Sequence, residues 1–314
     1  MVSTQTQGYR PPTRLQRYWK RMVRHRYIYL LLLPVVIYYL VFHYGTIYYA
    51  VIAFQNFKPK HGISGSSWVG MKNFVEFLTG NYAWRVIRNT LVMNLYCLAF
   101  GFTAPIILAL MINQMVDNKY KRVVQTVTYM PYFVSVVVVC GILREFCEST
   151  GLINDVLALF GFERANLLSD PKYFRTVFVA SNIWQNAGWG TIIYLATLSG
   201  VDQSLHEAAT IDGAGRLQRI IHVNIPAIMP VIVVQFIMRM GQMMSLGYEK
   251  IILLYSPATY ETADVISSYV YRRGLFERDY SYGAAVGLFN SLVNLTFLVI
   301  ANSMSKKVTE TSLW

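Results

Sequence analysis

Six stretches of this sequence each contain about 20 or more mainly apolar residues, the length that a helix needs to cross the hydrocarbon core of a membrane. They are residues 28–53, 89–113, 123–143, 176–200, 223–246 and 283–303. Of the 314 residues, 54% are apolar and only 14% are charged, so few residues remain to cover a surface in water. The sequence therefore predicts an all-α, polytopic membrane protein with six transmembrane helices, and it excludes disordered, collagen-like and disulfide-rich proteins.

The segment before the first predicted span is strongly basic and contains no acidic residue. Its cations are Arg10, Arg14, Arg17, Lys20, Arg21, Arg24 and Arg26. The apolar residues that recur among them at helical spacing are Leu15, Tyr18, Trp19, Met22 and Val23. This pattern predicts an amphipathic segment that lies on an anionic membrane surface. The net charge of +12 is therefore interpreted as membrane contact and not as binding to nucleic acid.

The lysines and arginines also predict the orientation of the chain. Because the number of predicted spans is even, both termini lie on one side. With the N-terminus inside, the inner segments 1–27, 114–122, 201–222 and 304–314 hold 14 of these residues, and the longer outer segments hold 13. Positive charge accumulates on the cytoplasmic side. We expect a basic cytoplasmic segment over 1–27, a membrane domain over 28–303 and a cytoplasmic tail over 304–314.

The sequence contains no common catalytic motif. It has no GxxxxGK[ST], HExxH or GxSxG pattern. The five histidines are scattered, and the three cysteines, Cys97, Cys140 and Cys147, form neither a CxxC pair nor a Cys/His cluster. We therefore predict that the chain is not an enzyme and binds no cofactor or metal ion of its own.

The predicted inner loop 201–222 has the most informative local pattern. Ser204 followed by Glu207 predicts a capping box, and therefore a helix that begins there. Asp212 and Gly213 then predict a turn at the end of this helix. Local physics allows two interpretations: a capped surface helix that links two spans, or a docking helix whose small residues and carboxylate contact a partner.

The same residues resemble a known family. Glu207-Ala208-Ala209, Gly213 after three residues, and Val223-Asn224-Ile225-Pro226 after nine more resemble the EAA motif of ABC importer permeases, EAA-x3-G-x9-I-x-L-P. Val223 replaces the isoleucine of the motif and Ile225 its leucine. The spacing is unbroken. The fold that this resemblance implies is the type I ABC importer permease fold, with a cytoplasmic EAA coupling-helix loop.

The resemblance extends over nearly the whole chain and is to permeases for carbohydrate uptake. The segments that carry it are Leu33-Pro34, 42–45, 69–74, Asn89-Thr90-Leu91, 264–266, Tyr271-Arg272, 283–289 and Ser312-Leu313-Trp314. The last four are similar to one subgroup of oligosaccharide permeases, which includes transporters for acidic, alginate-like sugars. The implied location is the cytoplasmic membrane of a bacterium.

The resemblance also implies partners and a mechanism. By this likeness, two distinct permease subunits would form the pore, and two ATPase subunits that hold ATP and Mg²⁺ would dock on the loop. A solute-binding protein would deliver the oligosaccharide from outside. The residues that would couple the loop to the ATPase are Glu207, Ala208, Ala209, Asp212 and Gly213. Glu207 would pair with a cation of the ATPase, and Gly213 would form the bend.

Polar residues within two predicted spans are candidates for the substrate pathway, because polar side chains in a span face a cavity or another helix. Those of the fourth span are Asn182, Gln185, Asn186 and Trp189, and those of the fifth are Gln235, Arg239 and Gln242. Amides suit sugar hydroxyls, an aromatic face suits a sugar ring, and Arg239 suits a sugar carboxylate. The alternative is that the amides clamp neighbouring helices and Arg239 pairs with an acid of a partner subunit.

Two other functions remain open from the residues alone. One is the same architecture serving a peptide, amino acid or ion. The other is an ion-coupled secondary transporter that works without an ATPase. Such transporters usually have internal repeats and acidic residues within the membrane, and this chain shows no convincing repeat and no Asp or Glu in its predicted spans.

Overall fold

The computed structural model describes residues 14–116, 118–309 and 311–314, and Arg10 of the basic segment lies outside these ranges. The described chain is almost entirely helical, as predicted. Its one sheet is a short antiparallel pair, β1 (Gln55–Asn56) and β2 (Ser67–Trp68), with Gln55 opposite Trp68. The pair closes the loop between the first two predicted spans.

Four continuous helices are long and apolar enough to cross a membrane. Arg26–Phe54 contains α2 (Arg26–Tyr38) and α3 (Gly45–Tyr49), and Ala83–Asn113 contains α5 (Ala83–Tyr96) and α6 (Thr103–Asn113). Arg216–Met240 contains α12 (Arg216–Arg219) and α13 (Ile225–Met240), and the fourth is α17 (Tyr280–Thr309). At 1.5 Å per residue the shortest is about 38 Å long, more than the hydrocarbon core of about 30 Å.

The predicted span 223–246 extends too far at its end. Helix α13 ends at Met240, and residues 241–247 are not helical. The helix that covers the predicted span 176–200 is α10 (Pro171–Ser199), which has 29 residues. It is long enough to cross a membrane, but its composition is less apolar than that of the four helices above.

The stretch 123–143, which the sequence predicts as one span, is not one continuous helix. This stretch contains α7 (Asn118–Tyr129), a 3₁₀ turn (Met130–Phe133) and α8 (Val136–Cys147), and the two halves meet at 96°. Pro131 is the second residue of the 3₁₀ turn, and Val134 and Ser135 have extended backbones. The Ser135 hydroxyl then accepts a hydrogen bond from the Val138 N–H and caps α8. The described residues thus contain four candidate spans, or five if this bent pair counts as one.

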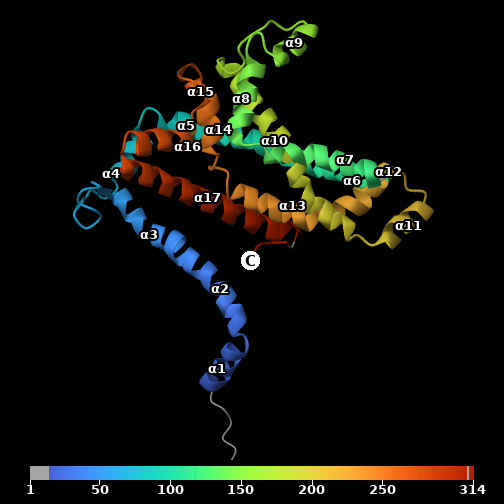
Figure 1. Cartoon of the computed structure of the whole chain (residues 1–314), viewed down its shortest axis with the longest axis horizontal. Helices are drawn as coiled ribbons and strands as arrows, with labels where there is room; N and C mark the ends of the chain where they lie inside the picture. Colours follow the sequence, from blue (N-terminus) through green and yellow to red (C-terminus); the bar gives the residue numbers. More distant parts are fainter. Residues whose placement is uncertain (1–13, 117, 310) are drawn as a thin grey trace, which may run out of the picture.

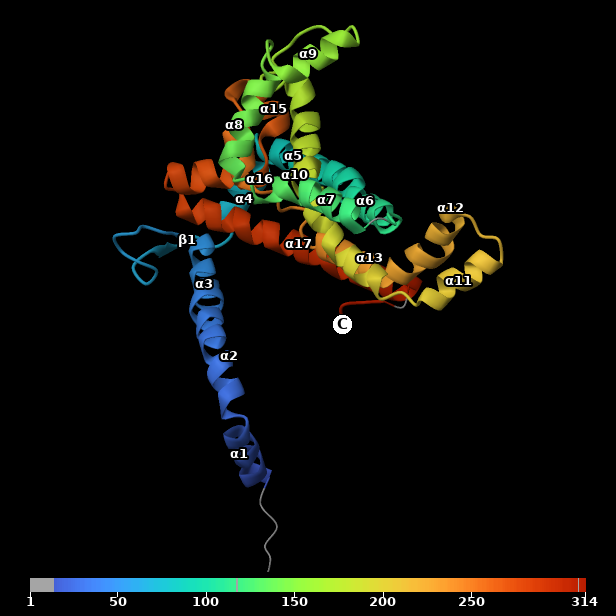
Figure 2. The ribbon, with the colours of Figure 1, turned by 45° about the vertical axis from the view of Figure 1, so that its right-hand side comes forward.

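The first helix stands apart from the rest of the chain, as Figures 1 and 2 show for α1 (Arg14–Arg24), α2 and α3. Helix α2 has no buried residue, although most of its side chains are apolar. The exposed side chains include Leu31, which is 76% exposed, and Phe42, which is 60% exposed. Such a surface needs lipid or another protein to cover it.

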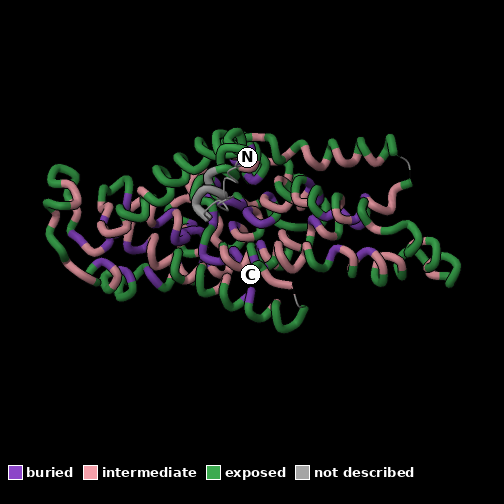
Figure 3. Tube along the Cα trace, turned by 90° about the horizontal axis from the view of Figure 1, so that it is seen from below, coloured by how far each residue is buried: buried purple, intermediate pink, exposed green. Residues whose placement is uncertain are grey.

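The other long helices form a bundle with α10 at its centre. Helix α10 packs against α6, α7 and α13, and α13 packs against α17. At its closest approach to α7, α10 has a glycine: a Cβ atom built on Gly188 would lie 1.9 Å from the carbonyl oxygen of Thr128. Figure 3 shows that the buried positions gather inside this bundle. Only a residue without a side chain permits this approach of the two backbones.

Shorter helices lie at the two ends of the bundle (Figures 1 and 2). Helix α11 (Gln203–Ile211) and α12 lie at one end. Toward the other end lie α4 (Lys72–Thr79), α9 (Leu152–Leu159), α14 (Tyr248–Leu254), α15 (Tyr260–Ala263) and α16 (Ile266–Val270). The loop 201–222 is therefore separated from the segments that the sequence predicts to be outside.

Candidate functional site

The N-cap of the loop helix α11 lies two residues before the predicted position. Its N-cap is Asp202, whose carboxylate accepts a hydrogen bond of 2.9 Å from the Ser204 N–H. Ser204 thus lies inside the helix, and the predicted Ser204–Glu207 capping box is wrong. A carboxylate accepts hydrogen bonds from the first N–H groups of a helix, and its negative charge is stabilised by the positive end of the helix dipole, which a hydroxyl is not. The hydrogen bond from the Ser204 backbone lowers the pKa of Asp202, which keeps this cap ionised.

The predicted turn at Asp212 and Gly213 is confirmed. Helix α11 ends at Ile211, and Gly213 has a φ of +77°, in the left-handed region. The Gly213 N–H donates to the Thr210 carbonyl, and the Ala214 N–H donates to the Ala209 carbonyl. This pair of bonds is a Schellman motif, which requires a residue that adopts a positive φ without strain. Gly213 therefore sets the angle between α11 and the chain that follows.

The chain after the turn is tied both to α11 and to α13. The Gly215 N–H donates to the Gln218 side chain at 2.7 Å and caps α12, and Arg219 donates to the Thr210 hydroxyl at 3.1 Å. The helix then continues without a break from Arg216 to Met240. A continuous helix therefore links the chain after the turn to the middle of the bundle.

The exposed surface of this loop is suited to contact with another protein. Glu207, Ala208 and Asp212 are exposed, and neither carboxylate has an ion-pair partner in the described part of the chain. Three apolar side chains beside them are also exposed: Leu205, Ile211 and Leu217. An apolar patch with carboxylates at its edge resembles the core and rim of a protein interface.

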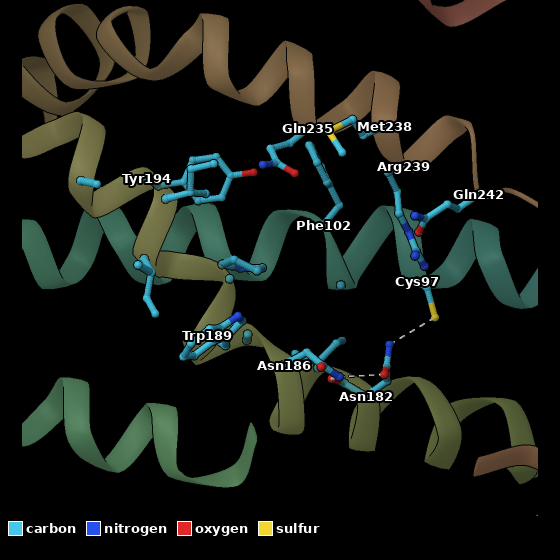
Figure 4. A pocket seen from close by; sticks show the side chains of 18 residues that line it. Cys97, Phe102, Asn182, Asn186, Trp189, Tyr194, Gln235, Met238, Arg239 and Gln242 are labelled. Atoms are coloured by element: carbon cyan, nitrogen blue, oxygen red, sulfur yellow. Dashed lines mark hydrogen bonds between the residues drawn. The ribbon is translucent and has the colours of Figure 1, made fainter. Parts of the chain in front are cut away.

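A cavity of about 890 Å³ lies between α5–α6, α10 and α13 (Figure 4). Six of the seven predicted pathway residues line it: Asn182, Asn186, Trp189, Gln235, Arg239 and Gln242. Asn182 and Asn186 lie on α10, opposite Gln235 and Arg239 on α13 (Figure 4). The spacing along the two helices thus brings residues about 50 positions apart in sequence to one cavity.

The seventh predicted residue, Gln185, is not among the residues that line the cavity. Its side-chain amide donates to the Val134 carbonyl at 3.3 Å, at the break between α7 and α8. Its oxygen accepts a hydrogen bond of 3.4 Å from the buried Lys250 of α14. Gln185 therefore supplies a hydrogen-bond donor to the Val134 carbonyl, which lies at the bend outside both helices.

Among the described residues that line the cavity, Arg239 alone is charged. Its guanidinium lies 3.4 Å from the Asn94 side-chain oxygen, and no carboxylate of the described residues lies within 4 Å of it. Asn182 donates to the Cys97 sulfur, and Asn186 donates to the Asn182 side-chain oxygen at 2.9 Å. A guanidinium inside a bundle without a carboxylate is suited to bind an anion.

One aromatic face of Trp189 is already covered. The Tyr132 ring stacks on it at a centroid distance of 4.6 Å and an interplanar angle of 4°, and Phe133 contacts it edge-on. The polar pattern of the fourth and fifth spans does not include these two residues, nor Asn94 and Cys97, because all four belong to other predicted spans. Asn94, a buried amide within an apolar stretch, was the available signal.

Comparisons with known proteins agree on one family. Its profile, described as "Binding-protein-dependent transport system inner membrane component", matches residues 101–310. The polygalacturonan/rhamnogalacturonan transport system permease protein YteP of Bacillus subtilis is 40% identical over 94% of this chain and 92% of that protein. Protein LplB of the same organism is 40% identical over 93% of this chain and 92% of its own length.

A solved structure is similar over nearly the same range. It is a chain of a bacterial alginate ABC transporter in complex with an alginate pentasaccharide-bound periplasmic protein. The TM-score is 0.85 at 40% identity, and the alignment covers 95% of this chain and all of that chain.

Proposed function

Because this chain belongs to the family of binding-protein-dependent transport system inner membrane components, we propose that it is the membrane-spanning permease subunit of an ABC importer for oligosaccharides. The 40% identity to YteP over 94% of the chain carries this proposal. The amide-lined cavity between α10 and α13 supports it, because amide groups both donate to and accept from sugar hydroxyls. The chain has the role of a transport subunit and not of an enzyme.

The proposed substrate is an acidic oligosaccharide. Two similar proteins carry names that refer to polygalacturonan and alginate transport, and both polymers are built from uronic acids. The cavity of this chain offers a matching group, the guanidinium of Arg239, which has no carboxylate partner within the described residues. A guanidinium binds a carboxylate through two parallel hydrogen bonds.

The proposed orientation has six spans and places both termini and the loop 201–222 in the cytoplasm. Segment 1–27 then lies on the inner membrane surface, 28–303 forms the membrane domain and 304–314 is the cytoplasmic tail. The bent pair α7–α8 and the helix α10 supply the two spans beyond the four straight ones. The basic N-terminus supports this orientation.

The proposed partners are a distinct second permease, two ATPase subunits that bind ATP and Mg²⁺, and an extracytoplasmic solute-binding protein. The exposed patch of Glu207, Ala208, Ile211 and Asp212, next to Ala209, would dock on the ATPase. Because α12 continues into α13, movement of the docked loop would shift Gln235 and Arg239 relative to α10. ATP-driven closure would thereby change the access of the cavity from one side of the membrane to the other.

Uptake tests this function directly. The chain is produced with its neighbouring permease, ATPase and binding-protein genes in a strain that lacks its own uptake system. We expect uptake of a labelled galacturonate trisaccharide that requires both the ATPase and the binding protein. Uptake that persists without any ATPase would favour an ion-coupled transporter. Uptake of peptides or amino acids without any oligosaccharide would favour the other alternative.

Arg239→Gln is expected to weaken the binding of an acidic trisaccharide to the assembled transporter at least tenfold, with no change for its neutral counterpart. Glutamine keeps the polarity but removes the charge, and a charge-assisted hydrogen bond contributes about 1.5–3 kcal/mol. The measurement is calorimetric titration with galacturonate and galactose trisaccharides of the same linkage. Arg144→Gln, at an exposed position on α8, is the matched control.

Equal affinity of the Arg239→Gln transporter for both sugars, at the wild-type values, would disprove the role in substrate binding. Loss of the second permease from the purified complex would instead favour pairing of Arg239 with an acid of that subunit.

Gly213→Pro is expected to reduce uptake at least tenfold while the complex still assembles. Proline holds φ near −65° and lacks the N–H that donates to Thr210, so the Schellman turn cannot form. The angle between α11 and α12 then changes, and the docked ATPase no longer moves α13 correctly. Uptake and ATP hydrolysis are measured in the same preparation. Ala214→Pro is unsuitable as a control, because the Ala214 N–H donates the second hydrogen bond of the turn, to the Ala209 carbonyl. Gln203→Pro, at the first position of α11, serves instead.

Unchanged coupling of uptake to ATP hydrolysis in Gly213→Pro would show that the turn does not transmit the movement.

A further inference from the structure

A second polar cleft, of about 680 Å³, lies where the start of α5 meets α15 and α16. Its lining includes Tyr82 and Arg85 from the start of α5, Tyr260 from α15, and Tyr269, Arg272 and Arg273 from α16 and the turn after it. Figure 1 shows this region at the end of the bundle away from α11 and α12. In the proposed orientation the cleft opens on the outer side of the membrane.

A buried carboxylate behind the lining of the cleft contacts two of the arginines that line it. Asp264 has no exposed surface, and it accepts hydrogen bonds from Ser268 at 2.8 Å and from Arg272 at 2.8 Å. Arg85 approaches the same carboxylate oxygen as Arg272, Oδ2, with 3.6 Å between the nearest nitrogen and this oxygen. Asn89 holds this segment in place by donating to the Asp264 carbonyl at 3.0 Å.

Arg85 retains most of its capacity to donate hydrogen bonds. Its contact with Asp264 is too long to be a hydrogen bond. Its Nε is buried and has no hydrogen-bond partner among the described residues. Asp264 carries one carboxylate and faces two guanidinium groups, so it can neutralise only one of them. The side chain is 28% exposed and therefore accessible from the cleft.

The walls of the cleft suit a sugar. Tyr82 and Tyr260 are held by the guanidinium groups of Arg85 and Arg272, at 4.8 and 4.7 Å from the ring centroids. Glu261 and Glu277 also line the cleft, and neither lies within 4 Å of Arg85. Carboxylates accept hydrogen bonds from hydroxyl groups, and guanidinium groups donate to hydroxyls and carboxylates. The carboxylates and guanidinium groups that line the cleft together match a ligand with both hydroxyl and carboxylate groups.

We propose that this cleft is a second saccharide-binding site, at which Arg85 binds a carboxylate of an acidic oligosaccharide before the sugar reaches the cavity between α10 and α13. The proposal rests on the proposed function of the chain as an oligosaccharide permease. The two sites lie along one continuous helix, Ala83–Asn113. Arg85 near its start lines the cleft, and Cys97 and Pro105 further along it line the cavity. Arg85 and Cys97 are 12 residues apart, or about 18 Å along a helix.

The test is calorimetric titration of the assembled transporter, without the binding protein, with a galacturonate trisaccharide and with a galactose trisaccharide of the same linkage. The wild type is expected to bind the acidic sugar at the cleft in addition to the cavity. Arg85→Gln is expected to remove one bound acidic trisaccharide per transporter, or to weaken its binding at least tenfold, with no effect on the neutral sugar. Arg88→Gln, one helical turn further along the exposed side of α5, is the matched control and is expected to bind as the wild type does.

Arg85→Lys keeps the positive charge beside Asp264 but removes the planar guanidinium that binds a carboxylate through two hydrogen bonds. This variant tests the proposal if Arg85→Gln does not assemble. We expect it to weaken the acidic trisaccharide several-fold. Acidic-sugar binding equal to wild type in every assembled Arg85 variant overturns the proposal. It is also overturned if Arg85→Gln weakens only the attachment of the binding protein, because the carboxylate would then belong to that protein.

The proposed function is tested separately by the wild type. A wild-type transporter that imports only neutral oligosaccharides overturns the second site and leaves the permease function intact. A wild-type transporter that imports no oligosaccharide overturns the function itself.

Discussion

Replacement of Glu207 by arginine is expected to abolish ATP-driven oligosaccharide uptake. Glu207 is exposed at the middle of α11 and has no ion-pair partner among the described residues, so its charge is available to a docked ATPase. Reversal of the charge would place two cations against each other in a desolvated interface. Breaking a buried ion pair costs about 3–5 kcal/mol, which corresponds to a loss of at least a hundredfold in coupling.

The measurement compares three properties of the Glu207→Arg transporter: uptake, ATP hydrolysis stimulated by the loaded binding protein, and sugar binding to the isolated binding protein. The first two are expected to be lost, and the third is expected to stay at the wild-type value. Glu145→Arg makes the same change at an exposed position on α8 and should transport normally. Normal uptake by Glu207→Arg would remove the assignment of α11 as the docking helix.

Gly188→Ala is expected to have the largest effect on stability. A Cβ at this position would lie 1.9 Å from the Thr128 oxygen, 2.4 Å from its carbonyl carbon and 3.0 Å from the Tyr129 nitrogen. All three are backbone atoms, so no change of rotamer removes the overlap. Helices α7 and α10 would have to separate by about 1.5 Å to restore ordinary contact. That separation would also disturb the stacking of Tyr132 on Trp189, one residue further along α10.

Overpacking of this kind costs about 3 kcal/mol or more. We expect little assembled transporter after purification, and a melting temperature lower by about 6 °C or more in what remains. Gly141→Ala is the matched control, because a Cβ at Gly141 in α8 would meet no atom within 4 Å. A Gly188→Ala transporter as stable as the Gly141→Ala transporter would show that α7 and α10 do not approach each other at this position.

The apolar stretches predicted most of the long helices because a membrane span depends on length and local hydropathy. Residues 28–53, 89–113 and 283–303 each lie within a continuous helix of the structure. The turn at Gly213 was predictable for a similar reason, since the small set of residues that adopt a positive φ reveals it in sequence. The EAA spacing connected this turn to a family without any knowledge of the fold.

The errors arose where one local signal competed with another. Ser204 and Asp202 both suit a helix N-terminus, and the carboxylate takes the position. Pro131 within an apolar stretch is compatible with a kinked span or with a break. The structure has a bend of 96° there, stabilised by Gln185 of α10, which is more than 50 residues away. No local pattern contains that partner.

The sequence by itself determined the class of the protein, the position of the loop turn and the family, because hydropathy, turn chemistry and motif spacing are properties of neighbouring residues. Only the tertiary structure decided which polar side chains meet. It brought Asn182 and Arg239 to one cavity and turned Gln185 to the bend. It also brought Arg85, which lines the second cleft, to Asp264, 179 positions away in the sequence. Such contacts depend on how whole helices pack, and packing sums many weak interactions between distant segments.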